Sequence, residues 1–426
     1  MKGKQMKKLY SLIDKVYRKE NLMKAFKHVK INNGAPGTDG ETVLDFKANE
    51  TENINLLHEQ LKTNTYKPSP VKRVGISKED GSIRNLGMPT VRDKVVQQAI
   101  VNIIEPHFDR TFHPSSYGYR RGHSQQQAVA KAEQFMNRYG LTEVVDMDLS
   151  KCFDTLNHDL IIESVSELIS DSRVLKLIRL FLESGVKIGS KIIETEVGSS
   201  QGGVFSPLIS NIYLNKFDQK MKSKGIRIVR YADDILIFAK DKQTAGNYRK
   251  YATKVLEEEL KLKVNEDKTH LTNIDEGVAF LGFIIKGKYL QIQPKRIQRF
   301  KDKIRQITKR NAGRSLESVI KELNPVIRGW INYYRVANIK KLLRGIMSWI
   351  RRRLRMIKMK QWKTYKKMHK EMRRLGIKGN GMKMDVCRWK NSGIHIVHLI
   401  LPNKYFDEMG LIDLCKYEVG LLSNYY

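Results

Sequence analysis

The tetrapeptide Tyr231-Ala232-Asp233-Asp234 lies between two apolar runs, residues 226–229 and 235–239. These β-rich runs predict a hairpin with two carboxylates at its tip. Adjacent carboxylates next to buried strands repel one another unless a bound cation or a shifted pKa offsets the charge. Mg²⁺ is the natural candidate because it takes hard oxygen ligands and is shared between one or two carboxylates and substrate phosphates. An ordinary polar turn is the alternative, since Asp is common in turns.

A third carboxylate is available upstream of this hairpin. Residues 143–149 indicate a buried strand whose end, Asp146-Met147-Asp148-Leu149, carries carboxylates at alternate positions. A strand that ends in Asp can place its carboxylate beside the tip of a neighbouring hairpin. We therefore expect Asp148 to join Asp233 and Asp234.

The charge balance indicates a polyanionic partner. The 426-residue chain has 79 Lys and Arg against 45 Asp and Glu, a formal net charge of +34, far more than solubility requires. A membrane surface is the competing polyanion, but no apolar run approaches the roughly 20 residues that span a bilayer. No signal peptide is visible either, so we expect no membrane partner. Three cysteines without CxxC spacing, Cys152, Cys387 and Cys415, favour a reducing compartment over a zinc site or disulfides.

The first half of the chain contains several further candidate binding segments. Residues 1–60 have helical periodicity, broken by a Gly, Pro and Asn-rich loop at 32–40. Residues 71–76 and 83–86 predict a hairpin carrying Lys78 and Arg84, which suits a triphosphate clamp, although such strands are more often a solvated face. Residues 116–122 mix aromatic residues with arginine, which suits stacking and phosphate contact. A glycine-rich loop at 198–207 leads into a helix at 208–221 and suits holding template or nucleotide.

The composition changes at Pro294, beyond which apolar residues recur at helical spacing. Residues 340–374 contain 15 Lys and Arg and one acidic residue, Glu371. Solvated helices usually interleave the two signs, whereas phosphate-binding helices do not. The candidates for RNA contact are Arg351, Arg352, Arg353, Arg355, Lys358 and Lys363. We also expect a strand at 280–285 and a closing helix at 411–422.

The order of these features resembles the successive sequence blocks of reverse transcriptases, and specifically of group II intron reverse transcriptases and maturases. Residues 33–40 resemble that family's extra N-terminal block, and residues 323–334 resemble its thumb or maturase signature. The resemblance covers nearly the whole chain, and the joint order is more specific than any single block. The matching blocks are Lys78 and Arg84, Asp148 with Phe153, Gln201-Gly202-Gly203, Tyr231-Ala232-Asp233-Asp234, Asn265 with Lys268, and Phe280-Leu281-Gly282-Phe283.

The resemblance implies an α+β right-hand polymerase fold, with fingers and a palm bearing an antiparallel sheet, followed by an α-helical thumb or maturase domain. We expect a helical N-terminal extension at 1–60, fingers and palm at 61–293, and the thumb at 294–376. A small DNA-binding-like tail at 377–426 would follow, without an endonuclease domain, as in the bacterial group IIC-like lineage.

The resemblance also assigns roles to single residues. Asp148, Asp233 and Asp234 would be the catalytic residues and would hold two Mg²⁺ ions. Nucleotide contacts would come from Lys78, Arg84, Phe153, Gln201 and Lys268. Phe153 would pack against the sugar and exclude a 2′-hydroxyl, with a plain core aromatic as the alternative. Lys268 would protonate the pyrophosphate, with an ordinary surface lysine as the alternative.

Four positions depart from the family's usual pattern. Cys152 stands where a second Phe is common, and Ser200 stands where Pro usually precedes Gln201. Arg121 and His123 stand where Pro and Arg are usual. Because none of these changes removes a metal ligand, we expect activity. The sequence does not decide how these changes affect the shape of the nucleotide pocket.

The function implied is that of an RNA-directed DNA polymerase that copies intron RNA into cDNA and binds the same RNA to promote splicing and mobility. Its partners would be group II intron RNA, template-primer, target DNA and deoxynucleoside triphosphates in a bacterial cytoplasm. The sequence does not decide the oligomeric state; a monomer bound to RNA is one of the alternatives. The alternatives are a related reverse transcriptase used in defence or repair, and an RNA-binding maturase with a vestigial polymerase site.

Overall fold

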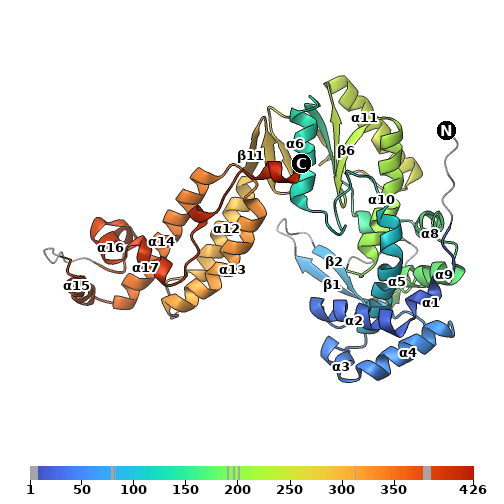
Figure 1. The fold of residues 1–426 in the computed structure, drawn as a ribbon, viewed down its shortest axis with the longest axis horizontal. Coiled ribbons are helices and arrows are strands. Elements are labelled where there is room, and N and C mark those ends of the chain that lie inside the picture. The colour runs from blue at the N-terminus through green and yellow to red at the C-terminus, as the bar shows by residue number, and fades with distance from the viewer. Residues whose placement is uncertain are drawn as a thin grey trace. The chain divides into compact units, whose positions relative to one another are not determined.

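The computed structural model describes residues 8–77, 81, 83–189, 191–194, 197–199, 202–311, 313–377 and 385–426. The chain divides into two compact units, Met1–Thr272 and Asn273–Tyr426, which are described separately (Figure 1).

The N-terminal unit begins with helices, as the periodicity predicts. Apolar residues of α2, among them Leu22 and Phe26, are spaced to form one buried face, and this helix packs against α5. The loop at 32–40 is held in place, because Lys94 Nζ donates to the Ala35 carbonyl at 2.6 Å. A Cβ at Gly37 would lie 2.6 Å from the Thr90 backbone, so only glycine allows this approach. These helices are α1 (Ile13–Val16), α2 (Lys19–Asn32), α3 (Val43–Ala48), α4 (Glu50–Lys62) and α5 (Val91–Asp109).

The N-terminal unit contains a four-stranded sheet in the order β2-β1-β4-β5. Strands β1 and β2 pair antiparallel with Arg73 opposite Gly87, which confirms the predicted hairpin, while β1 and β4 run parallel. The strands are β1 (Val71–Ser77), β2 (Ile83–Met88), β4 (Val186–Ile188) and β5 (Lys191–Ile193).

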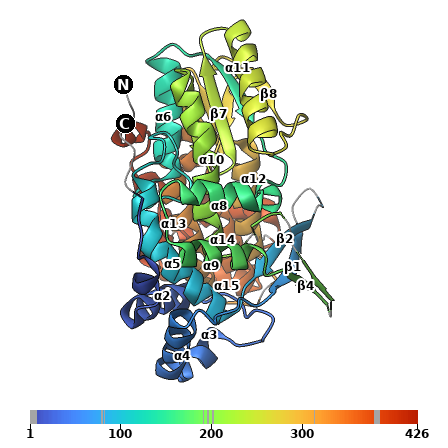
Figure 2. The ribbon, with the colours of Figure 1, turned by 90° about the vertical axis from the view of Figure 1, so that its right-hand side faces the viewer.

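The same unit contains a second four-stranded sheet in the order β6-β7-β3-β8, and helices α6 and α11 pack against its strands (Figure 2). Its central strands, β3 and β7, are largely buried, and apart from Glu143, Asp146 and Asp234 their residues are apolar, as expected for strands covered by helices. The strands are β3 (Glu143–Met147), β6 (Arg227–Tyr231), β7 (Asp234–Ala239) and β8 (His270–Asn273); the helices are α6 (Gln125–Asn137), α7 (Cys152–Thr155), α8 (His158–Ser166), α9 (Ser172–Leu182), α10 (Ser206–Ser223) and α11 (Lys242–Lys254), which continues as a π-helix over Val255–Glu259.

The outer edge of β6 is covered by the loop that follows α5. Arg230 N donates to the Ser115 carbonyl at 2.9 Å, and Tyr117 N donates to the Arg230 carbonyl at 2.9 Å. This loop therefore pairs with the strand whose last residue, Tyr231, leads into the hairpin tip.

The C-terminal unit begins with a small sheet in the order β11-β10-β9. The predicted single strand at 280–285 was wrong, because the chain turns at Leu281, whose φ is +48°, and at Gly282. Two antiparallel strands result, and Tyr333 Oη donates to the Leu281 carbonyl at 2.9 Å. The strands are β9 (Val278–Phe280), β10 (Phe283–Lys286) and β11 (Tyr289–Ile292).

Helices make up the rest of this unit, and α12 starts at Pro294, where the composition changes. Phe300 of α12 and Trp330 of α13 stack with ring centroids 4.3 Å apart. The predicted closing helix at 411–422 was wrong: apart from two short 3₁₀ turns, Leu414–Lys416 and Leu422–Tyr425, these residues are irregular. No helix in the described ranges is both long and apolar enough to cross a bilayer. The helices are α12 (Pro294–Ile307), α13 (Leu316–Tyr334), α14 (Lys340–Trp362), α15 (Tyr365–Arg374), a 3₁₀ turn at Trp389–Gly393, α16 (His395–Ile400) and α17 (Asn403–Glu408).

Candidate active site

The hairpin tip carries the first two candidate carboxylates. Tyr231 of β6 pairs with Asp234 of β7, so Ala232 and Asp233 form a two-residue turn between the strands. Ala232 has a φ of +59°, a left-handed conformation that costs an L-residue roughly 1–2 kcal/mol. The surrounding structure must therefore hold this turn in place.

Strand register brings the third carboxylate to the same place. β3 and β7 pair antiparallel with Met147 opposite Ile235, so Asp148, the next residue, comes opposite Asp234. Asp146 lies on the same face, because side chains two apart along a strand point the same way. Asp146 was not among the site residues predicted from the sequence, although the alternation Asp146-Met147-Asp148 was the signal for it.

The carboxylates of this cluster affect one another. Desolvation of the carboxylate raises the pKa of Asp234 to about 7, although part of the residue is exposed to solvent. The negative charges of Asp233, Asp146 and Asp148 also raise this pKa. Burial likewise raises the pKa of Asp146 to about 6, where His270 opposes the effect and Asp148 adds to it. Because these carboxylates repel one another when ionised, a divalent cation bound between them would be stabilised.

Asp148 is held by the segment that precedes β8. Asn265 Nδ2 donates to Asp148 Oδ2 at 3.0 Å, and Lys268 Nζ lies 3.3 Å from the same oxygen. The Asn265 N–H also donates to the Asp148 carbonyl at 2.9 Å. Lys268 therefore lies within the carboxylate cluster, with 66% of its side chain exposed, and lowers the pKa of Asp234.

The cluster fits Mg²⁺ in the chemistry of its donors. Its oxygens are hard ligands, they come from adjacent strand ends, and desolvation together with their mutual repulsion raises the pKa of Asp234. Within the described ranges, however, no three acidic, His or Cys side chains already converge on one metal position. Mg²⁺ needs only one or two carboxylates, since it keeps several waters and shares the phosphates of its substrate.

The predicted nucleotide-binding residues are only partly described. Phe153 on α7 is buried, and its ring meets Tyr119 edge to face at 6.2 Å. Burial raises the pKa of the neighbouring Cys152 thiol to about 12, so this departure from the family pattern is an inert core residue. Lys78, Ser200 and Gln201 lie outside the described residues, and Arg84 is described only as part of the β2 backbone.

The arginines of the loop at 116–122 have partners within the protein. Arg120 Nε donates to Asp109 Oδ1 at 2.7 Å, and its other nitrogens donate to the His113, Ser116 and Asp109 carbonyls. Arg121 pairs with Glu105 at 3.0 Å. Arg120 therefore stabilises the loop, which is a structural role the residue pattern alone did not indicate.

The six candidate RNA contacts on and after α14 fall into two groups. Arg351 pairs with Asp407 at 3.2 Å and Asp413 at 3.0 Å, and Arg355 donates to the Leu401 carbonyl at 2.9 Å. Both arginines are buried and attach the C-terminal segment to α14. The others, Arg352, Arg353, Lys358 and Lys363, are partly or fully exposed.

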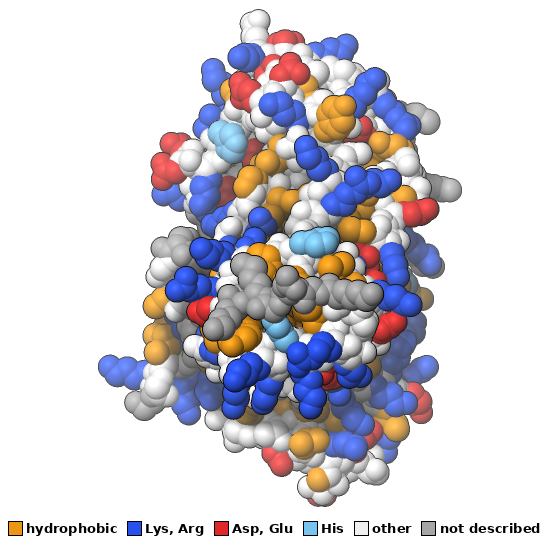
Figure 3. Space-filling view, turned by 90° about the vertical axis from the view of Figure 1, so that its left-hand side faces the viewer, with side chains coloured by type: hydrophobic (Ala, Val, Ile, Leu, Met, Phe, Trp, Pro, Cys, Tyr) orange, Lys and Arg blue, Asp and Glu red, His pale blue; other side chains and the backbone are white. Residues whose placement is uncertain are grey.

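Two of the exposed group line a basic cavity. Lys358 and Lys363 border a cavity of about 610 Å³ at the start of α13. Lysine and arginine side chains, drawn in blue, are frequent on the face of the molecule that Figure 3 shows. The cations of this cavity, called the basic cavity below, are Lys309, Arg310, Arg314, Lys358, Lys360 and Lys363.

Comparison with known proteins gives two family matches. Residues 76–285 match the reverse transcriptase (RNA-dependent DNA polymerase) family, and residues 297–376 match the group II intron maturase-specific domain. The chain is similar to protein YkfC of Escherichia coli K12, with 32% identity over 58% of this chain and 74% of YkfC. The chain belongs to the group II intron reverse transcriptase and maturase family.

Two further relatives are intron-encoded by name. The group II intron-encoded protein LtrA of Lactococcus lactis subsp. cremoris is 27% identical over 62% of this chain and 54% of LtrA. The putative COX1/OXI3 intron 2 protein of Saccharomyces cerevisiae is 26% identical over 70% of this chain and 45% of that protein. The chain thus spans about half the length of these two relatives.

The family match follows the elements of the structure. The reverse transcriptase match runs from the end of β1 into β10 and includes every carboxylate of the cluster. The maturase match covers α12 to α15 and includes the basic cavity. As a family member the chain is an RNA-directed DNA polymerase with a maturase domain, and the predicted polymerase fold is confirmed.

Proposed function

We propose that Asp148, Asp233 and Asp234 are the catalytic carboxylates of DNA synthesis on an RNA template, and that they hold two Mg²⁺ ions together with the incoming triphosphate. When bound, such ions stabilise the charges of an in-line displacement at the primer 3′-hydroxyl. The observation that carries the proposal is the register of β3 and β7, which puts Asp148 opposite Asp234.

The residues around the carboxylates have distinct proposed tasks. Asn265 orients the Asp148 carboxylate through its 3.0 Å hydrogen bond. Lys268 offsets the charge of the cluster and would be the proton donor to the leaving pyrophosphate. Phe153 lies five residues after Asp148 and would exclude a 2′-hydroxyl, so that deoxynucleotides are preferred. Lys78, Arg84 and Gln201 complete the proposed nucleotide contacts on grounds of family pattern.

We further propose that group II intron RNA binds to the maturase domain through the basic cavity and the partly exposed Arg352 and Arg353. Six cations around one cavity suit a folded RNA backbone, because phosphate contacts supply most of the affinity in such complexes. Arg351 and Arg355 contribute indirectly, since they attach the C-terminal segment to α14. Template-primer and target DNA would be further partners in a bacterial cytoplasm.

Primer extension on an RNA template tests the polymerase proposal. The wild type should extend the primer with deoxynucleotides and Mg²⁺, and far less with ribonucleotides. Asp233→Ala and Asp234→Ala should abolish extension and leave RNA binding intact. Asp267→Ala is the matched control, because Asp267 is an exposed acidic residue beside Lys268. An inert wild type that binds structured RNA tightly would favour a maturase with a vestigial polymerase site.

A further inference from the structure

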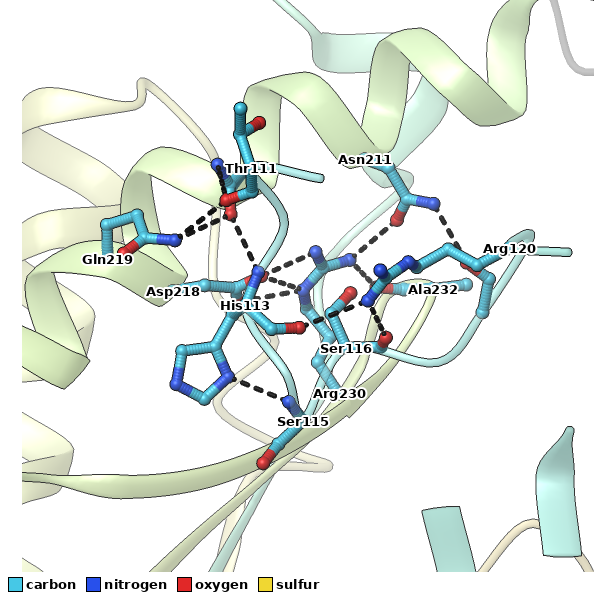
Figure 4. A network of polar contacts seen from close by, with 12 residues as sticks. Thr111, His113, Ser115, Ser116, Arg120, Asn211, Asp218, Gln219, Arg230 and Ala232 are labelled. Atoms are coloured by element: carbon cyan, nitrogen blue, oxygen red, sulfur yellow. Dashed lines mark hydrogen bonds and ion pairs between the residues drawn. The ribbon is translucent and has the colours of Figure 1, made fainter. Parts of the chain in front are cut away.

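A fully buried ion pair lies beneath the hairpin tip (Figure 4). Arg230 and Asp218 have side-chain exposures of 0%. Arg230 Nη2 lies 2.6 Å from Asp218 Oδ2, and Arg230 Nε donates to both Asp218 oxygens at 2.9 and 3.0 Å. Because neither side chain reaches solvent, this pair contacts neither substrate nor template.

The remaining nitrogen of the guanidinium is directed at the turn. Arg230 Nη1 donates to the Ala232 carbonyl at 3.0 Å and to Asn211 Oδ1 at 3.0 Å. The Ala232 carbonyl belongs to the peptide plane that includes the nitrogen and the Cα of Asp233. Fixing this oxygen therefore fixes the plane from which the Asp233 side chain projects. Ala232 also needs such support, since its φ of +59° is unfavourable for alanine.

A second contact restricts the turn through different atoms. A Cβ at Gly118 would lie 2.2 Å from the Ala232 nitrogen and 3.0 Å from the Tyr231 carbonyl carbon, so the two backbones touch. Asn211 joins both supports, because its Nδ2 donates to the Gly118 carbonyl at 2.8 Å while its Oδ1 accepts from Arg230. The turn is thus held by Arg230 and by Gly118.

Stability alone is a weak explanation for this arrangement. Burying two charges costs several kcal/mol in desolvation, and well-packed apolar residues often serve a core equally well or better. Apolar residues, however, cannot donate to the Ala232 carbonyl. Lysine is not an equivalent of arginine here either, since the guanidinium uses its planar fork to reach Asp218, Asn211 and Ala232 together.

We propose that Arg230, Asp218 and Asn211, with Gly118, are positioning residues that set the Ala232–Asp233 peptide and thereby the placement of Asp233 and Asp234 for metal binding and catalysis. This inference rests on the proposed function of those carboxylates. It predicts that loosening the turn lowers metal affinity and the turnover rate, while the binding of template-primer, which uses other surfaces, is unchanged.

The test replaces the buried pair by apolar residues, as Asp218→Leu together with Arg230→Met. Four quantities are measured: the Tm, the Kd for a template-primer duplex, the Kd for Mn²⁺ by calorimetry, and kcat for primer extension. We expect the Tm and the duplex Kd to be retained. The Kd for Mn²⁺ should rise and kcat should fall. Each change should be on the order of 10- to 100-fold, as expected when reacting groups are slightly misplaced.

Two further variants keep the test decisive if the double variant does not fold. Gly118→Ala leaves the ion pair intact and displaces the turn, so it should give the same loss of Mn²⁺ affinity and kcat. Arg173→Lys is the matched control, because Arg173 donates to the Leu61 and Lys62 carbonyls instead of the turn; both quantities should stay near wild type.

Unchanged Mn²⁺ affinity and kcat in folded double and Gly118→Ala variants would overturn the inference. Failure of the proposed function looks different, because the wild type would then lack primer extension. The Mn²⁺ affinities of the same variants would still decide whether the network positions the carboxylates.

Discussion

Lys268 Nζ lies 3.3 Å from Asp148 Oδ2, the same oxygen that accepts a hydrogen bond from Asn265 Nδ2 at 3.0 Å. One carboxylate oxygen of the candidate active site thus has two donors, one of them a cation. Lysine supplies positive charge where Asp146, Asp148, Asp233 and Asp234 accumulate negative charge. The electrostatic repulsion among the carboxylates is therefore offset in part by Lys268.

Replacing the cation should change the pH dependence of metal binding. Lys268 lowers the pKa of Asp234, so Lys268→Met should raise that pKa, and proton competition should then persist to higher pH. We expect the midpoint of Mn²⁺ binding against pH, measured by calorimetry, to move upward. Primer extension should slow by about 100-fold if Lys268 is also the proton donor. Lys263→Met is the control, since Lys263 is exposed in the same segment; equal pH midpoints in both variants would contradict the prediction.

The metal-free protein should become less stable as pH rises through the range where Asp234 titrates. Its pKa is raised from 3.8 to about 7, so between these values the folded protein keeps a proton that the unfolded chain has released. The free energy of unfolding should then fall from about pH 4 to pH 7. Urea unfolding in EDTA should show a weaker dependence for Asp234→Asn than for the wild type. Asp267→Asn should behave as the wild type; identical slopes in all three proteins would refute the assignment.

Arg351 should be required for stability of the C-terminal unit. Its side chain is 10% exposed and pairs with Asp407 and Asp413, so Arg351→Ala leaves two carboxylates without their cation. We expect a loss of about 3–5 kcal/mol in the free energy of unfolding of this unit, measured in urea. Arg344→Ala, at an exposed position of the same helix, should cost less than about 0.5 kcal/mol. Similar losses in the two variants would show that the pairing does not anchor the segment.

The basic cavity should determine the salt dependence of RNA binding. Lys358→Ala and Lys363→Ala should each reduce the slope of log K against log salt by about 1, because each removes one phosphate contact. Affinity for structured RNA is measured over a series of KCl concentrations. Lys404→Ala is the control, since Lys404 is exposed in the same unit but does not line the cavity. A slope that stays at the wild-type value would place the RNA elsewhere.

The sequence predicted elements whose signals are local. The hairpin at 226–239 was identified by apolar runs around two acidic residues, and α12 by the composition change at Pro294. Strand pairing is a long-range property, so the alignment of Met147 with Ile235, and the inclusion of Asp146, required the structure. The error at 280–285 has a local cause: Leu281 adopts a left-handed conformation that its residue type does not indicate.

Charge runs were the least informative signal, because they do not show which side of a helix meets the rest of the chain. Arg351 and Arg355 belong to the same basic run as Lys358, yet their partners lie in the segment after residue 400. Acidic residues such as Asp413 are too distant in sequence for a pattern within α14 to reveal them. The network around Arg230 was missed for the same reason, since Gly118 lies in the loop after α5, and Asn211 and Asp218 lie on α10, apart from β6.

The loop that pairs with Arg230 has a consequence for the protein before it meets RNA. A strand at the border of a sheet offers unpaired N–H and carbonyl groups to other chains and so promotes aggregation. Ser115 and Tyr117 occupy those groups of Arg230, on β6, through backbone hydrogen bonds. The loop therefore acts as a cover over the strand that carries the hairpin tip, and newly made copies of the protein are less able to join edge to edge at this point.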